Sequence, residues 1–305
     1  MTLSICAPED AILRYEAAGF WHRRGLVDEL RAWAGNEPDR ELVIDRWGRH
    51  TYGEIRAKVD AICAGLTKIG VERGERVGVQ LPNWHQWIVL SLALEQMGAV
   101  IAPIPVTYRE KEVSDVLRVS GAKTLVCVSS FRGFDHLAMV SSIRKSLPLL
   151  ERVVIVGDPA SADAAHLRYE SLLDTPPLSE SQRRPVDAHA LREVVFTSGS
   201  TGEPKGVMHT TNTIACDYIV IARGAELTRD DVIFMPSPIG HQLGFADGAS
   251  MPVHLGARAV YIDQWDPAHA VELMAKERVT FTCTTPTFLV DVLRAPNLAE
   301  HACLP

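Results

Sequence analysis

The chain has 305 residues, of which 47% are hydrophobic and 23% charged, and its formal net charge at pH 7 is -7. This composition is ordinary for a soluble globular protein, and the length allows one large domain or two lobes with a substantial core. The acidic balance argues against nucleic acid as the partner, because no surplus of basic side chains is available to neutralise a phosphate backbone. A nucleotide is compatible with it, since a small anion needs only a local set of donors.

From residue 51 onward, helical and strand patterns alternate along the chain. Thr51 and Glu54 form a capping box, and the apolar residues behind them recur at steps of three and four until Gly70, which predicts a helix between these points. Strands are predicted at 76–81, 99–104, 123–128 and 152–156, and helices at 84–97, 109–120 and 134–147. The strands are continuous apolar runs, which predicts an α/β lobe whose mostly parallel sheet is covered by helices on both faces.

The segment 176–190 is polar, carries prolines and is aperiodic, and we interpret it as a connection between two lobes. The first lobe is predicted to span residues 1–175 and the second residues 191–305. Alternation resumes in the second lobe, with strands near 192–197, 231–235, 257–262 and 279–284 and helices near 209–223, 267–277 and 286–294.

The cysteines and the most apolar stretch bear on metal content and location. Six cysteines stand alone, and neither a Cys-x-x-Cys pair nor a His/Cys cluster with zinc spacing occurs, so we expect no metal held by side chains and a reducing cytoplasm. The N-terminus lacks the basic and apolar regions of a secretory signal. The stretch 88–106 is interrupted by Glu95, Gln96 and two prolines, which favours a buried helix followed by a buried strand over a membrane span.

The strand at 192–197 runs directly into small and hydroxyl-bearing residues that end in Pro204, Lys205 and Gly206. Glycine lets backbone amides approach an anion closely, serine and threonine add short donors, and the lysine ammonium can neutralise phosphate charge. The competing interpretation is a flexible linker with a surface lysine, but a linker would not normally follow a buried strand directly. The pattern therefore predicts a phosphate-binding loop.

Other motifs of phosphate binding and nucleophilic catalysis do not fit. A P-loop requires Gly-Lys-Ser/Thr, whereas Lys205 lies between Pro204 and Gly206. No Gly-x-Gly-x-x-Gly follows a strand and no Gly-x-Ser-x-Gly elbow occurs, which argues against a dinucleotide site and against a serine hydrolase. An unrelated α/β phosphotransferase is an alternative that no kinase or P-loop motif supports.

The segment Thr197-Ser-Gly-Ser-Thr-Gly-Glu-Pro-Lys-Gly206 resembles the signature of the adenylate-forming superfamily, which includes acyl-CoA synthetases, adenylation domains of peptide synthetases and luciferases. The segments 50–55, 77–83, 98–103 and 235–245 are similar to other stretches of that family. The resemblance implies the α/β fold of the N-terminal domain of acyl-CoA synthetases, with two mostly parallel sheets and flanking helices, truncated before its end. It also implies ATP-dependent activation of a carboxylic acid through an acyl-adenylate, with coenzyme A as the thiol acceptor.

The resemblance also implies roles for individual residues. The loop of this family holds the β- and γ-phosphates of ATP, and its lysine assists pyrophosphate. Magnesium is expected to bridge phosphate oxygens. His241 is implied to position or gate the carboxylate, although without the resemblance an ordinary loop histidine would be the better interpretation. Gly240 departs from the family pattern, because many relatives carry an aromatic residue before the histidine. The residues implied to bind nucleotide are Thr197, Ser198, Gly199, Ser200, Thr201, Gly202 and Lys205.

Motifs that the family carries beyond the histidine segment do not appear by residue 305. They are a Thr-Glu segment, a ribose-binding aspartate and a lysine on a C-terminal domain. We therefore expect an incomplete N-terminal domain that lacks the lysine-bearing domain and is a poor ligase alone. Two alternatives stay open: a non-catalytic nucleotide-binding remnant, and an acyl- or aryl-AMP ligase that passes its product to another acceptor. Among the CoA ligases of this family, the sequence resembles those for cyclohexanecarboxylate and medium-chain fatty acids. A homo-oligomer is compatible with the sequence.

Overall fold

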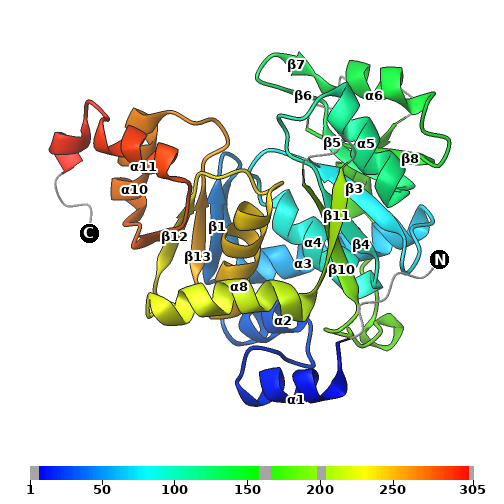
Figure 1. Ribbon diagram of the computed structural model, residues 1–305, viewed down its shortest axis with the longest axis horizontal. Helices are drawn as coiled ribbons and strands as arrows, with labels where there is room; N and C mark the ends of the chain where they lie inside the picture. The colour runs from blue at the N-terminus through cyan, green and yellow to red at the C-terminus, as the bar shows by residue number, and fades with distance from the viewer. Residues whose placement is uncertain (1–6, 158–165, 198–203, 302–305) are drawn as a thin grey trace.

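The computed structural model describes residues 7–157, 166–197 and 204–301, which form two large sheets with helices packed around them (Figure 1). In spatial order, the seven-stranded sheet consists of β11 (Lys205–Thr210), β10 (Leu191–Thr197), β4 (Val100–Pro103), β3 (Arg76–Gln80), β5 (Thr124–Val128), β8 (Arg152–Val156) and β9 (Leu167–Arg168). The five-stranded sheet consists of β14 (Phe281–Thr282), β12 (Val232–Met235), β13 (Arg258–Tyr261), β1 (Glu41–Asp45) and β2 (Gly48–Thr51). A separate hairpin pairs β6 (Ser130–Phe131) with β7 (Phe134–Asp135).

Helices cover the sheets. They are α1 (Glu9–Ala17), α2 (Leu26–Asn36), α3 (Tyr52–Lys68), α4 (Gln86–Met97), α5 (Glu110–Ser120), α6 (His136–Arg144), α7 (Tyr169–Leu173), α8 (Thr211–Gly224), α9 (Met251–Leu255), α10 (Pro267–Glu277) and α11 (Pro286–Leu293). A π-helical turn spans Gly244–Ser250, and short 3-10 turns span Glu180–Gln182 and Leu298–His301. In the described part of the chain, none of these helices is long and apolar enough to span a membrane.

The pairing of the strands confirms the predicted fold class, an α/β arrangement of two mostly parallel sheets. All pairs in the two sheets are parallel except β10 with β11 and β1 with β2. The sheets nevertheless combine strands from both sides of the segment 176–190. Strands β10 and β11 extend the sheet of β3, β4 and β5, while β1 and β2 complete the sheet of β12 and β13. The connection predicted from sequence is therefore not a boundary between sheets.

The centre of the molecule is the helix α4, in which every residue from Gln86 to Gln96 is buried. This confirms the interpretation of the stretch 88–106 as a buried helix and strand. The carboxylate of Glu95 lies inside this core and accepts hydrogen bonds from the backbone amides of Leu26 and Val27 and from the hydroxyl of Thr211. A buried carboxylate is tolerated because these donors replace water. Glu95 thereby joins α2 and α8 to the central helix.

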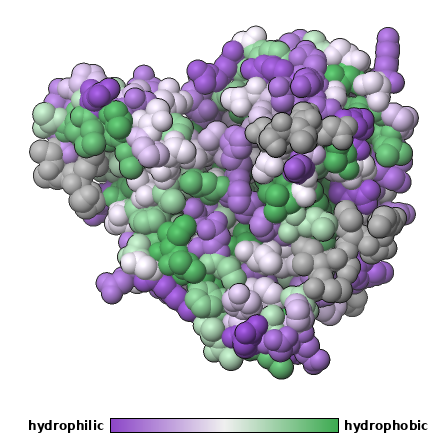
Figure 2. All heavy atoms as spheres, viewed as in Figure 1, coloured by the Kyte–Doolittle hydropathy of each residue, from purple (hydrophilic) through white to green (hydrophobic). Residues whose placement is uncertain are grey.

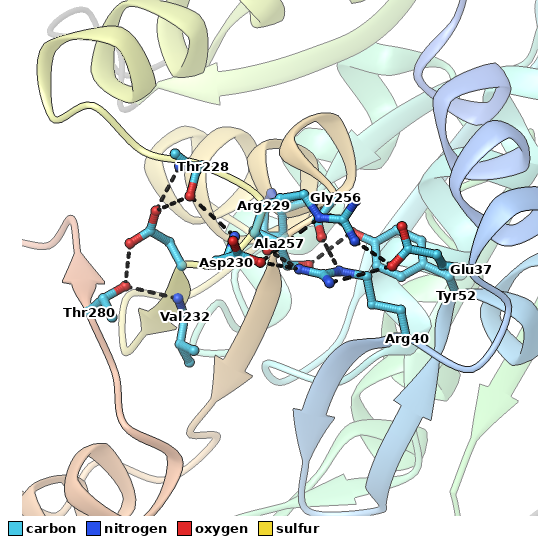
Figure 3. A network of polar contacts seen from close by, with 12 residues as sticks. Glu37, Arg40, Tyr52, Thr228, Arg229, Asp230, Val232, Gly256, Ala257 and Thr280 are labelled. Carbon is cyan, nitrogen blue, oxygen red and sulfur yellow. Dashed lines mark hydrogen bonds and ion pairs between the residues drawn. The ribbon is translucent and has the colours of Figure 1, made fainter.

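Local sequence signals set the ends of α3. The hydroxyl of Thr51 accepts from the amide of Glu54, the Glu54 carboxylate accepts from the amide of Thr51, and Gly70 follows the helix with a φ of 88°. Figure 3 shows how the start of α3 is tied to the second sheet. The phenol of Tyr52 donates to the carbonyls of Pro252 and Ala257, both at 2.9 Å. The start of α3 is therefore anchored to α9 and to the residue before β13.

Three features differ from the sequence-based expectations. The predicted helix 134–147 begins only at His136, because Phe134 and Asp135 pair with β6. The residues 205–210 form the strand β11 before α8 begins at Thr211. The first fifty residues, for which no element was predicted, supply α1, α2, β1 and most of β2. The strands of the β1–β2 and β10–β11 hairpins depend on pairing with each other, and a local sequence pattern does not reveal that pairing.

Candidate functional site

Two paired strands flank the predicted phosphate loop in the sequence. Strands β10 and β11 are antiparallel, and their register pairs Phe196 with Gly206 and Thr197 with Lys205. Residues 198–203 lie outside the described part of the chain, so the predicted ligands Ser198, Gly199, Ser200, Thr201 and Gly202 are not placed. The two described members of the predicted site, Thr197 and Lys205, stand opposite each other at the base of that segment. Both are exposed to solvent.

Lys205 is free to meet an anion. Within the ranges 7–157, 166–197 and 204–301, no carboxylate forms an ion pair with it, and β11 is the outer strand of its sheet. Gly206 is required next to it, because a Cβ built at this position would lie 2.9 Å from Cγ1 of Val194 and 3.3 Å from Cε1 of Phe196. The absence of a side chain at Gly206 therefore leaves room for the side chains of Val194 and Phe196 on the neighbouring strand β10.

The histidine segment that follows β12 is held by one buried side chain, Asn83. Its amide nitrogen donates to the carbonyls of Met235 at 3.2 Å and Ser237 at 2.9 Å, and its oxygen accepts from the amide of Ile239 at 2.9 Å. Asn83 follows strand β3 of the seven-stranded sheet, whereas its partners are the last residue of β12 in the five-stranded sheet and two residues that follow this strand. The segment that carries His241 therefore lies at the junction of the two sheets, beyond the carboxyl ends of β3 and β12.

His241 itself is exposed, and its ring meets that of Tyr108 edge to face with centroids 6.2 Å apart. Partial desolvation by the surrounding protein lowers the pKa of His241, which favours the neutral ring. The preceding Gly240 has a packing role: a Cβ there would lie 2.8 Å from the backbone of Ile104 and Pro105. An aromatic residue does not fit at Gly240 while the chain after β4 passes this closely.

Two buried carboxyl groups near this segment were not singled out from the sequence. Glu193 on β10 is fully buried, and burial raises its pKa to about 8, so the carboxyl is protonated at neutral pH. The side chain of Gln242, the residue directly after His241, lies next to the Glu193 carboxyl. Asp247 in the π-helical turn is 1% exposed, and burial raises its pKa to about 7. Alternation along a strand does not reveal that an acidic residue faces the interior, so sequence patterns carried no signal for either group.

One group of side chains in the described ranges has the composition of a metal site, namely Asp45, His50 and His85. Its centre is already approached by a cation. The ammonium of Lys58 lies 3.2 Å from Nδ1 of His50 and 3.2 Å from Nε2 of His85. The two imidazole rings are 3.9 Å apart between centroids and tilted by 35°. Their nitrogens both face the Lys58 nitrogen, so an ammonium that donates to both rings occupies the place that a metal ion would need.

Comparison with known proteins places these features in a family. The model of the AMP-binding enzyme family matches residues 30–304. The chain belongs to the AMP-binding enzyme family. The match includes the β10–β11 hairpin and the segment held by Asn83, as the resemblance of the loop signature had indicated.

Relatives and solved structures agree with this assignment. The chain is 30% identical over 296 residues to a medium-chain fatty-acid–CoA ligase of Escherichia coli, covering 96% of this chain and 52% of that protein. It is 31% identical over 301 residues to a 2-hydroxy-7-methoxy-5-methyl-1-naphthoate–CoA ligase of Streptomyces carzinostaticus, covering 94% of this chain and 52% of that protein. The apo structure of MbtA from Mycobacterium smegmatis superposes with a TM-score of 0.81 at 27% identity, over 93% of this chain and 52% of that one. The chain spans about half the length of the curated relatives it matches.

Proposed function

We propose that this chain is the nucleotide-binding part of an enzyme that activates a carboxylic acid with ATP and then transfers the acyl group to coenzyme A. The observation that carries the proposal is the β10–β11 hairpin, which presents the small-residue segment 198–203 with Thr197 and Lys205 at its base. The family match over residues 30–304 supports this function. The names of two relatives, both CoA ligases for carboxylic acids, support the same class of substrate and acceptor.

The donor set of the hairpin fits a polyphosphate. Hydroxyls and backbone amides of 197–202 would donate hydrogen bonds to the β- and γ-phosphates, and the ammonium of Lys205 would neutralise charge on the departing pyrophosphate. Magnesium needs no dedicated cage here, because it takes phosphate oxygens and water as most of its ligands. In the proposed reaction, ATP supplies the α-phosphorus that the carboxylate attacks. Charge neutralisation by Lys205 and by the loop is the contribution of this chain.

His241 is proposed to position the substrate carboxylate next to this loop. Its segment is anchored at Asn83, and the following Gln242 neighbours Glu193, four residues before Thr197 on β10. A displacement of the segment that carries His241 would therefore also move β10, the strand that leads into the phosphate loop. A neutral His241 can donate a hydrogen bond to a carboxylate without a net charge that would hold the carboxylate in an ion pair. The acid itself is proposed to be a medium-chain or aryl carboxylic acid, by analogy with the two relatives.

The first experiment is binding of ATP–magnesium to the 305-residue chain by isothermal titration calorimetry. It is paired with exchange of labelled pyrophosphate into ATP in the presence of octanoate or benzoate. Saturable ATP binding that is weakened in Lys205→Ala supports the proposal. Binding without pyrophosphate exchange favours the nucleotide-binding remnant, as expected for a chain that spans half the length of its relatives. Absence of ATP binding in a folded chain contradicts the proposed role of the hairpin.

A further inference from the structure

A buried cluster that the proposed function does not use lies between the ends of β1 and α4. Asp45 ends β1, His50 lies on β2, and His85 immediately precedes α4. All three are at most 9% exposed, whereas Lys58 on α3 is only partly buried. The cluster thus joins three interior groups to one amine that solvent can reach.

The hydrogen-bonding chemistry of the cluster fixes its protonation pattern. Oδ2 of Asp45 lies 2.9 Å from Nδ1 of His85 and also accepts from the His85 amide at 2.7 Å. Oδ1 of Asp45 lies 3.4 Å from Nε2 of His50, a longer and poorly directed contact. A carboxylate only accepts and an ammonium only donates, so His85 carries its proton on Nδ1 and turns an unprotonated Nε2 toward Lys58.

Asp45, His85 and the Lys58 amine therefore form a hydrogen-bonded series of the type that activates nucleophiles. A base lies within hydrogen-bond reach of the amine, and the base is oriented by a carboxylate on its other nitrogen. His50 repeats the contact on a second side, with Nδ1 at 3.2 Å from the Lys58 nitrogen. Hydrogen bonds to the two imidazoles use two of the three N–H groups of the ammonium. Loss of the third proton therefore leaves a lone pair that points away from both rings.

We propose that Lys58 is a reactive amine that activated acyl groups, such as acyl thioesters, modify covalently. The neutral Lys58 nitrogen attacks the thioester carbonyl carbon, so that a C–N bond forms as the C–S bond breaks. One of the two N–H protons passes to Nε2 of His85 while the other stays on the amide nitrogen, and the proton taken up by His85 balances the one that the departing thiolate needs to leave as a free thiol. The products are an amide on Lys58 and one thiol, with no oxidant or reductant. The inference stands independently of the nucleotide site, because any acyl thioester can serve as donor.

The surroundings favour the neutral amine that this step requires. Burial lowers the pKa of Lys58, although the charges of Glu54 and Asp45 oppose this effect. Burial likewise lowers the pKa of His85, despite its hydrogen bond to Asp45, so the ring stays neutral and available as a proton acceptor. Lys68, on the same helix, is exposed and provides a reference for an ordinary surface lysine.

The test is competitive acetylation of the folded 305-residue chain with the small thioester S-acetyl-N-acetylcysteamine at neutral pH. Unreacted lysines are then acetylated with an isotopic label after unfolding, and peptides are quantified by mass spectrometry. We expect Lys58 to react at least about tenfold faster than Lys68 and Lys111, because a positioned base that takes the proton as the C–N bond forms accelerates the attack. A Lys58 rate equal to or below that of Lys68 in the wild-type chain overturns the proposal.

Variants separate activation by histidine from exposure alone. His85→Gln keeps a polar side chain but removes the base, and is expected to reduce the Lys58 rate to that of Lys68. The rates at Lys68 and Lys111 should stay unchanged, and circular dichroism reports whether the variant is folded. His50→Gln is expected to give a smaller reduction, because its contact with Asp45 is longer. An unchanged Lys58 rate in a folded His85→Gln chain contradicts the role of His85, and an unfolded variant leaves the wild-type comparison to decide.

Discussion

Thr197 and Lys205 face one another across the antiparallel ladder of β10 and β11, at the last register pair before the predicted phosphate loop. The pairing brings the residues on either side of the predicted loop next to each other. It also sets Lys205 on an outer strand, where its ammonium is solvated until an anion arrives.

Replacing Lys205 by alanine is expected to weaken ATP binding by about tenfold or more. A charge-assisted hydrogen bond to a phosphate is worth about 1.5–3 kcal/mol, and Lys205 has no ion-pair partner in the described ranges whose release would compensate. Calorimetric titration with ATP–magnesium measures the change. Lys276→Ala, far along the chain on α10, is the matched control and should bind as the wild type does. Equal affinities for the Lys205 variant and this control would remove the lysine from the site.

Gly240→Ala is expected to destabilise the protein by about 1–3 kcal/mol, because the new methyl group would lie 2.8 Å from the backbone of Ile104 and Pro105. Backbone atoms cannot move aside as a flexible side chain can. Urea unfolding followed by tryptophan fluorescence gives the free energy of unfolding. Gly224→Ala on α8 is the control, since no atom lies within 4 Å of its Cβ position and alanine favours a helix. Equal stability of the two variants would show that the chain after β4 is not rigid here.

Glu193→Gln is expected to flatten the dependence of stability on pH. The folded state keeps the Glu193 proton up to a pKa of about 8, whereas the unfolded chain releases it near the ordinary value of about 4.3. Between these values the folded state binds more protons than the unfolded state, so the free energy of unfolding falls as pH rises. The variant should therefore gain stability relative to the wild type between about pH 5 and about pH 8, by at least about 1 kcal/mol.

Thermal unfolding at several pH values checks the Glu193 prediction. Asp247, whose pKa is raised to about 7, also makes the free energy of unfolding fall as pH rises. The Glu193→Gln variant therefore keeps part of the dependence of stability on pH. The exposed Glu272→Gln on α10 should leave the profile as in the wild type. A Glu193→Gln profile parallel to that of the wild type would mean that Glu193 is ionised in the folded protein.

The helix α11 is expected to drive self-association of the chain. None of its residues is buried, and Leu293, Leu289 and Val290 are 72%, 44% and 40% exposed. Figure 2 shows hydrophobic atoms at the surface over the region of α10 and α11. Leu293→Glu should lower the association seen by sedimentation velocity as concentration rises, because charge on an apolar patch opposes its burial. Val220→Glu, on the exposed face of α8, serves as the control, and equal association of the two variants would place the contact elsewhere.

The fold could be predicted from the sequence where local signals and burial agree. The capping box of Thr51 and Glu54 and the apolar strands around Val77 and Leu125 describe elements that form as predicted. The strands β1, β2 and β11 were missed, because β1 pairs with the distant β13 and because a local pattern does not reveal the hairpin partners of β2 and β11. Of the candidate site residues, Thr197 and Lys205 pair across β10 and β11, and their role in phosphate binding stays a prediction. The hydrogen bonds of Asn83 form only where the two sheets meet, so the sequence did not reveal them.

Strand β1 has a consequence for how the protein is made. Its residues Val43 and Ile44 pair with Ala259 and Val260 of β13, while β2 is its neighbour on the other side. During synthesis, β1 and β2 leave the ribosome as a lone hairpin long before β13 exists, and an isolated hairpin is only marginally stable. The sheet of β3, β4, β5 and β8 can assemble in the meantime from consecutive segments. We therefore expect a late, slow closure step, with the first fifty residues exposed to chaperones until the chain beyond Tyr261 has emerged.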